Sequence, residues 1–86
     1  MKLNRNFLLH QMENEYVLVP VGGTDFNGII RGNRTFGAVL ELLKDEVTEA
    51  EIVASMRTVF DAPEGAVEQD VATVLSELRK VGALEE

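Results

Sequence analysis

Hydrophobic residues follow a strand-like pattern up to about residue 33 and a helical pattern beyond it. The first part contains three short runs that we interpret as strands, at residues 7–12, 16–21 and 26–31. The first is apolar-rich, the second is rich in aromatic and β-branched residues, and the third alternates loosely. Asn14 lies between the first two runs and Gly22-Gly23 precedes the third, where tight turns are needed. This pattern predicts an antiparallel three-stranded meander with residues 26–31 at an edge. Pro20 has no N–H to donate, so we expect it where strand pairing lapses.

After Gly32 the apolar residues recur at spacings of three and four, which predicts three helices. Asn33 is the expected cap of the first helix, and the sequence from Thr48 to Glu51 is a capping box that starts the second. The third is expected to begin near Pro63 and Glu64 and to end at Gly82. The expected buried residues are Phe36, Val39, Leu40 and Leu43 in the first helix, Ile52, Met56, Val59 and Phe60 in the second, and Val67, Val71, Val74, Leu75, Leu78 and Val81 in the third.

Strands first and helices afterwards indicate an α+β fold, a three-stranded antiparallel sheet followed by three helices. We expect Ala83 and Leu84 to fold back onto the core. With 86 residues and no internal repeat, the chain is predicted to form a single domain, residues 1–86.

The chain has no cysteine, which excludes disulfides and thiolate metal sites and suits a reducing compartment. Its N-terminal segment offers only an isolated apolar triplet, too short for a signal-peptide core or a membrane span. We therefore expect a cytoplasmic protein with no membrane partner.

The net charge of −7 is unevenly distributed. Residues 1–37 carry four basic and three acidic side chains, whereas residues 38–86 carry four basic and twelve acidic ones. Nucleic-acid binding depends on Lys and Arg side chains that neutralise phosphates. The acidic half of the chain therefore argues against a nucleic-acid partner.

Candidate catalytic side chains are few. His10 is the one histidine, and it lies in a predicted strand without an acidic partner at motif spacing, which favours a structural role. Ser55 and Ser76 lie in predicted helices outside any nucleophile-elbow pattern. Gly22-Gly23 precedes a strand, not the helix N-terminus that a phosphate site needs. The sequence thus predicts no enzyme activity, no cofactor and no metal site.

An open sheet edge remains the candidate for function. The unpaired main-chain N–H and C=O groups of an edge can bind an extended peptide as an added strand. In the predicted edge at residues 26–31, Gly28 would permit a close approach of another backbone. Two other interpretations stay open: an ordinary protected edge strand, and a homodimer formed through a sheet edge.

Five segments resemble one family: residues 16–20 (YVLVP), 26–30 (FNGII), 40–43 (LELL), 48–53 (TEAEIV) and 70–84 (DVATVLSELRKVGAL). The last is the most specific, because it combines Asp-Val, a Leu two turns later and a Gly before the final hydrophobic residue. Over nearly all of its length the chain resembles the PqqD-like family, which is named after a pyrroloquinoline quinone biosynthesis factor and includes the peptide-recognition elements of modified-peptide pathways.

The resemblance implies a winged-helix-like domain that binds the leader of a ribosomally made precursor peptide and presents it to a modifying enzyme, often a radical SAM protein. In the family the leader adds antiparallel to the third strand and packs beside the third helix. Carried onto this sequence, the peptide-binding residues are Phe26, Asn27, Gly28, Ile29, Ile30 and Arg31 for strand pairing, and Asp70, Val71, Val74, Leu75 and Leu78 for the groove. Because one helical stripe cannot face two ways, part of the second set belongs to the core.

The chain departs from the family pattern at one place, where residues 20–23 read Pro-Val-Gly-Gly without the Pro-Glu pair of quinone-pathway members. This departure implies a divergent relative that serves another peptide. The alternative function is a winged-helix transcriptional regulator, which requires a basic recognition helix. The predicted third helix instead contains four acidic residues, Glu64, Glu68, Asp70 and Glu77, against Arg79 and Lys80.

Overall fold

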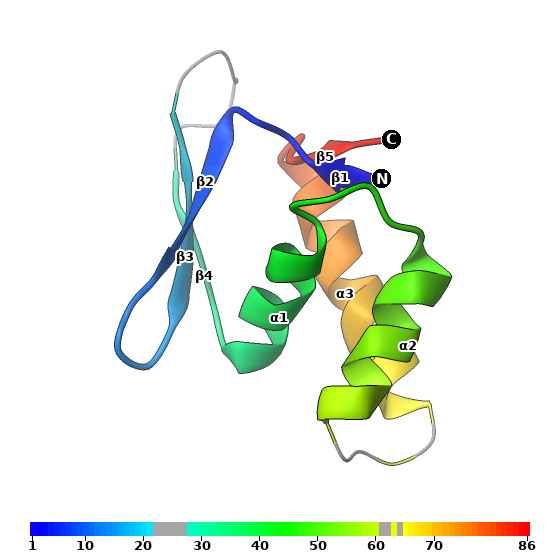
Figure 1. The fold of residues 1–86 in the computed structure, drawn as a ribbon. Coiled ribbons are helices and arrows are strands. Elements are labelled where there is room, and N and C mark those ends of the chain that lie inside the picture. The colour runs from blue at the N-terminus through cyan, green and yellow to red at the C-terminus, as the bar shows by residue number, and fades with distance from the viewer. Residues whose placement is uncertain (22–27, 61–62, 64) are drawn as a thin grey trace.

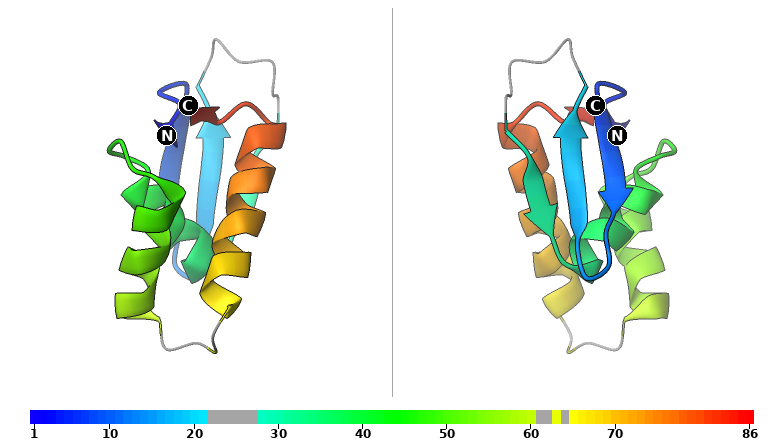
Figure 2. Two further views of the ribbon diagram at one scale, coloured as in Figure 1. Left: turned by 90° about the vertical axis from the view of Figure 1, so that its right-hand side faces the viewer. Right: turned by 90° about the vertical axis from the view of Figure 1, so that its left-hand side faces the viewer.

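The computed structural model describes residues 1–21, 28–60, 63 and 65–86. In chain order its elements are β1 (Lys2–Leu3), β2 (Phe7–Gln11), β3 (Tyr16–Pro20), β4 (Ile30–Gly32), α1 (Arg34–Leu42), α2 (Glu49–Val59), α3 (Ala66–Lys80) and β5 (Leu84–Glu85). The three helices lie on one face of a three-stranded sheet (Figures 1 and 2). The predicted α+β architecture is confirmed.

The sheet has the order β2-β3-β4, with both pairs antiparallel. Its register places Leu18 of β3 opposite Leu9 of β2 and opposite Ile30 of β4. Because residues paired across an antiparallel sheet share a face, these three side chains point toward the helices, and Leu18 is fully buried. The other face carries the paired residues Leu8 and Val19, which no helix covers.

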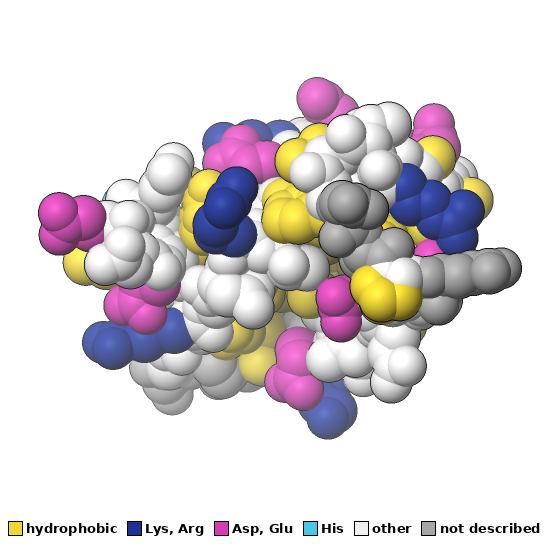
Figure 3. Space-filling view, turned by 90° about the horizontal axis from the view of Figure 1, so that it is seen from below, with side chains coloured by type: hydrophobic (Ala, Val, Ile, Leu, Met, Phe, Trp, Pro, Cys, Tyr) yellow, Lys and Arg dark blue, Asp and Glu magenta, His cyan; other side chains and the backbone are white. Residues whose placement is uncertain are grey.

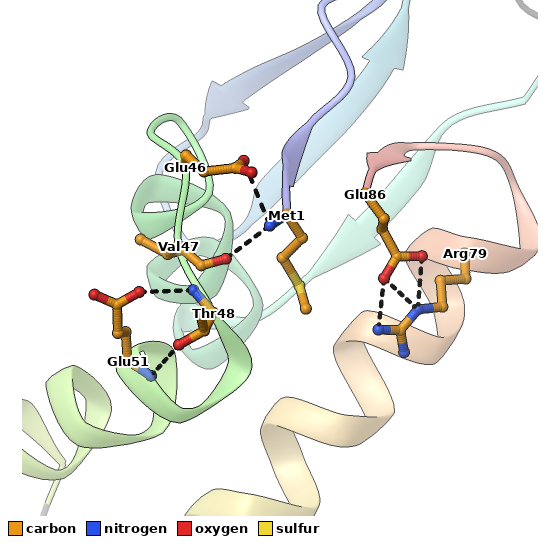
Figure 4. A network of polar contacts seen from close by, with 7 residues as sticks. All are labelled: Met1, Glu46, Val47, Thr48, Glu51, Arg79 and Glu86. Atoms are coloured by element: carbon orange, nitrogen blue, oxygen red, sulfur yellow. Dashed lines mark hydrogen bonds and ion pairs between the residues drawn. The ribbon is translucent and has the colours of Figure 1, made fainter.

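The predicted starts of the first two helices are confirmed at the level of individual hydrogen bonds. The Asn33 side chain accepts from the Phe36 N–H at 3.1 Å, which caps α1. At α2 the Thr48 hydroxyl accepts from the Glu51 N–H at 3.1 Å, and the Glu51 carboxylate accepts from the Thr48 N–H at 2.9 Å (Figure 4). Helix α3 begins at Ala66, after Gly65 in a left-handed conformation, so it starts later than Pro63.

The core lies between the sheet and the helices. Residues of α1, α2 and α3 meet Phe7 and Leu18 of the sheet, and the residues with no exposed surface are Leu18, Val39, Leu40, Leu43, Ile52, Val71, Leu75, Leu78 and Ala83. Val59 does not join them, contrary to expectation, and its side chain is 69% exposed. The buried stripe of α2 runs through Ile52, Met56 and the partly buried Phe60 at four-residue spacing, and Val59 lies beside that stripe.

Strand β4 begins four residues later than the predicted third strand and includes Gly32. Gly28 and Ile29 are exposed and precede the strand, while Phe26, Asn27 and the Gly22-Gly23 turn lie outside the described residues. Pro20 explains the late start: in the β3–β4 register the next hydrogen-bonded pair beyond Leu18 and Ile30 would join Pro20 to Gly28, and proline has no N–H to donate.

Chain segments near the two termini form a ribbon that the sequence analysis did not predict. Leu3 of β1 lies opposite Leu84 of β5, and Ala83 and Leu84 fold back onto the core as expected. The Met1 ammonium donates to the Val47 carbonyl at 2.9 Å (Figure 4). Two-residue strands carry little pattern of their own, which is why this pairing was not predicted.

At the far end of the ribbon, the Arg79 guanidinium donates to the Glu86 carboxylate at 3.0 Å (Figure 4). This hydrogen bond raises the pKa of Arg79 and lowers the pKa of Glu86 below its ordinary value of 4.5. Among the described residues, no helix is long and apolar enough to cross a membrane.

Candidate functional site

A groove of about 420 Å³ is lined by strand β4, the start of α1 and helix α3. Figure 2 shows β4 as the edge strand of the sheet on the side where α3 lies. The lining of the groove comes from the strand, the start of α1 and one face of α3: Ile30, Arg31, Gly32, Asn33, Thr35, Phe36, Asp70, Thr73, Val74 and Glu77. The α3 residues are three, four and seven positions apart, so they share one face of the helix. The groove therefore lies along both the open strand and the helix.

The hydrogen-bond register shows which main-chain groups of β4 face this groove. Met12 donates its N–H to the Glu15 carbonyl across the β2–β3 hairpin, and bonded pairs alternate in antiparallel strands. Following that alternation across β3, Ile30 and Gly32 bond to β3, whereas the N–H and C=O of Arg31 point away from it. The outer edge of β4 is thus open at Arg31.

Charges in the groove are divided between its two walls. Asp70 and Glu77 lie on α3, and Arg31 lies on the strand. Arg31 is 3.9 Å from the Glu15 carboxylate and Glu77 is 3.8 Å from the Lys80 ammonium, both long for ion pairs. Asp70 has no ion-pair partner in the described parts of the chain.

An apolar floor lies between the charged walls. It is formed by the partly buried Ile30 and Val74 and by the buried Phe36. Gly32 fits here because it lacks a side chain: a Cβ at this position would overlap the Phe36 ring. The groove thus combines an open strand edge, an apolar floor and charged side chains at the rim.

The structure places nine of the eleven predicted site residues, in three sets. Ile30, Arg31, Asp70 and Val74 line the groove. Val71, Leu75 and Leu78 are fully buried core residues, so their side chains have no surface in it. Gly28 and Ile29 are exposed before β4, and Phe26 and Asn27 lie outside the described residues.

Sequence reasoning missed several lining residues, chiefly Thr73 and Glu77 on α3 and Phe36 on α1. A helical signal was present for the first two, because Thr73 and Glu77 follow Asp70 at three and seven residues and so share its face. Phe36 was assigned to the core. Its side chain is buried there, with 7% of its surface exposed, and it also lines the groove.

The candidate catalytic side chains named from the sequence do not line this groove. The His10 side chain is exposed on β2, and no three His, Cys, Asp or Glu residues among those described are placed to hold a metal ion. The groove itself contains carboxylates and one guanidinium but no histidine or serine. Its composition suits binding of an extended chain.

Comparison with protein families gives a match to PqqD, described as coenzyme PQQ synthesis protein D, over residues 15–84. The chain therefore belongs to the PqqD family, and the resemblance noted in the sequence is confirmed. No curated protein matches the chain by sequence.

Two solved structures share the fold. TbiB1, in complex with the TbiA(beta) leader peptide, superimposes with a TM-score of 0.80 at 20% identity and covers 99% of this chain and 95% of its own. Lasso peptide synthetase B1, complexed with the leader peptide, gives a TM-score of 0.75 at 16% identity, with 99% and 96% covered. At these identities the agreement establishes the fold.

Proposed function

We propose that this protein binds the leader of a ribosomally synthesised precursor peptide at the groove between β4 and α3 and presents the peptide to a modifying enzyme. The observation that carries the proposal is the open main chain of Arg31 beside an apolar floor. An added strand would gain main-chain hydrogen bonds at Arg31 and bury side chains against Val74. The domain itself performs no chemistry in this proposal.

The geometry sets the order of side chains in the bound peptide. A peptide residue paired with Arg31 shares the outer face of the sheet, and its two neighbours point toward Phe36 and α3. Asp70 and Glu77 stand beside that apolar floor. We therefore expect an apolar residue and a basic residue on the α3 side of the leader, and an acidic or uncharged residue next to Arg31.

Both solved relatives of the same fold are complexes with leader peptides, which supports a leader as the ligand. PqqD membership supports an accessory role in a biosynthetic pathway. The modifying enzyme that the family resemblance implies is a radical SAM protein. A leader is present where ribosomes release the precursor, so we place this function in the cytoplasm.

A DNA-binding regulator is less compatible with the structure. Helix α3 exposes Asp70 and Glu77 where a recognition helix would need basic residues to contact phosphates. At the end of the molecule seen in Figure 3, the acidic and basic side chains of the described residues are interspersed among apolar ones. The charge pattern therefore favours a peptide over a nucleic acid.

Titration of the ¹⁵N-labelled protein with the leader of a precursor encoded beside it tests the proposal. The amides of Arg31, Thr73, Val74 and Glu77 should shift with saturable behaviour, while those at the β2 edge should not. A scrambled leader of the same composition is the control. Shifts that are confined to other regions, or that the scrambled peptide reproduces, would contradict the proposal.

A further inference from the structure

The opposite edge of the sheet carries a second groove, of about 540 Å³, beside strand β2. Its lining residues are Lys2, Leu3, Asn4, Arg5, Phe7, Leu8, Leu9, Lys44 and Glu85. Three of the eight basic residues of this acidic chain thus meet at one groove, against a single carboxylate. We call this surface the β2 groove.

The positive charge of the β2 groove is compensated only in part: Glu85 lies opposite Lys2 in the β1–β5 pair and lines the same groove. Lys2 and Arg5 are exposed, and within the described part of the chain neither side chain forms an ion pair. Lys44 lies 3.0 Å from the Glu41 carboxylate. The Glu85 carboxylate accepts a hydrogen bond from the Arg5 main-chain N–H at 3.3 Å, which leaves the guanidinium free to meet another anion.

Main-chain groups are open along the same edge. In the alternation fixed by the Met12–Glu15 bond, the even-numbered residues of β2 bond to β3. Leu9 and Gln11 therefore direct their N–H and C=O groups outward. Leu8, on the uncovered face of the sheet, is 49% exposed. The edge thus offers hydrogen bonds, a partly apolar surface and cations side by side.

The segment that carries the cations is held in place. Leu3 donates its N–H to the Leu43 carbonyl at 2.8 Å, and Asn4 donates its own to the Ala83 carbonyl at 2.7 Å. These bonds join residues 2–5 to the end of α1 and to the turn after α3. Lys2 and Arg5 are consequently attached to an ordered backbone, so a ligand would not have to order this backbone when it binds.

We propose that the β2 groove binds an extended segment of a second protein in which acidic residues alternate with apolar ones. The acidic residues would meet Lys2 and Arg5, and the backbone would pair with Leu9 and Gln11. A nucleic acid offers no peptide backbone to this edge. Pairing with the β2 edge of a second copy would bring the same cations together, which opposes that dimer.

The inference is independent of leader binding, because the two grooves lie on opposite edges of the sheet. We use as probe an acetylated, amidated octapeptide of alternating Glu and Leu, with the Lys-and-Leu peptide as its matched control. In the ¹⁵N-labelled full chain, the Glu peptide should shift the amides of residues 2–5, Leu9 and Gln11 and leave Arg31 and Val74 unchanged. The Lys peptide should produce no such shifts.

Two variants complete the test, and each of their substitutions replaces a basic residue by Glu. The double variant Lys2→Glu with Arg5→Glu should lower the affinity for the Glu peptide on the order of tenfold at low salt. The control, Arg34→Glu, lies at an exposed site beside the other edge and should leave this affinity unchanged. Because these residues are exposed, both proteins should fold, which circular dichroism verifies.

Several results would overturn the inference: no binding at millimolar probe, equal binding of the Lys peptide, shifts centred on Arg31, or no effect of the double variant. Self-association that the double variant abolishes would assign the β2 groove to a second copy and would also overturn it. These outcomes can be interpreted even if the leader does not bind at β4, because the two titrations are followed through the amides of different residues.

Discussion

The two edges of the sheet belong to one small scaffold and differ in what flanks them. Beside β4 stands helix α3 with Asp70 and Glu77; beside β2 lies the N-terminal segment with Lys2 and Arg5. Both edges present outward main-chain groups, which any extended chain could pair with. The hydrogen bonds are therefore common to the two edges, and the flanking charges determine which sequence each would accept.

This difference follows from the chain order. The acidic second half of the sequence supplies α3, and the nearly neutral first half supplies the sheet and the N-terminal segment. The meander places β3 between the edges, so α3 supplies the carboxylates beside β4 and the N-terminal segment supplies two of the three cations beside β2. An acidic protein can in this way retain one positively charged groove.

The largest effect is expected from Leu18→Ala, which damages both edges because β3 pairs with each of them. Leu18 is fully buried, and truncation of such a leucine costs about 3 kcal/mol of unfolding free energy. Urea unfolding measures the loss. Leu8→Ala removes the same atoms from a half-exposed side chain and should cost less than about 1 kcal/mol. If the two variants unfold at the same urea concentration, the result would contradict the burial of Leu18.

Arg31→Pro should impair peptide binding at the β4 edge without affecting binding at the β2 edge. It deletes the outward N–H of Arg31 and leaves the β3–β4 hydrogen bonds of Ile30 and Gly32 in place. Leader affinity should fall about tenfold or more, while binding of the Glu-and-Leu peptide at β2 should persist.

The matched control for Arg31→Pro is Arg31→Ala, which keeps the N–H and removes only a weakly paired charge, so it should cost about two- to threefold in affinity. Isothermal titration measures both variants. A proline variant that is folded and binds the leader as well as the alanine variant does would show that the peptide does not pair at this position.

Asp70→Lys tests the charge assigned to the β4 groove. The substitution should lower the affinity for a leader that has a basic residue on its α3 side, by about threefold to tenfold at low salt. A leader with that residue changed to Glu should bind the variant better than it binds the original protein. If affinity is unchanged for both leaders, the acidic wall of α3 does not select the peptide.

The smallest effect concerns the Arg79–Glu86 pair, which attaches β5, and through it β1, to the end of α3. The pKa of Glu86 is lowered in the folded state, so the pair stabilises the fold fully above pH 4.5 and loses this effect as the pH falls below that value. The melting temperature should therefore exceed that of Glu86→Gln at pH 6, with the difference vanishing in acid. If the two melting temperatures still differ at low pH, the Arg79–Glu86 pair is not the cause of the difference.

The sequence predicted best where a few adjacent residues determine the structure. The caps at Asn33 and Thr48 depend on bonds that span three residues, and both are present. The strand-then-helix order follows from the change in hydrophobic period. The start of β4 could have been found as well, since it depends on Pro20, but only once the register between the strands was known.

The lining of the candidate groove was predicted only in part, because it depends on contacts between distant segments. Asp70 and Val74 were identified on α3, whereas Val71 and Leu75, assigned with them, face the core. Periodicity gives the direction of a side chain relative to its own helix and does not show which neighbour lies opposite. The β2 groove was missed altogether, since it joins Lys2, Lys44 and Glu85 from three separate parts of the chain.

The pairing of β1 with β5 brings Lys2–Leu3 beside Leu84–Glu85, so the fold's first and last strands meet at one place on its surface. A short linker there would close the backbone into a ring, and new termini could then be opened at the exposed β2–β3 turn around Glu13 and Asn14. The same geometry would allow the whole domain to be inserted into a surface loop of an enzyme, held by two adjacent attachment points.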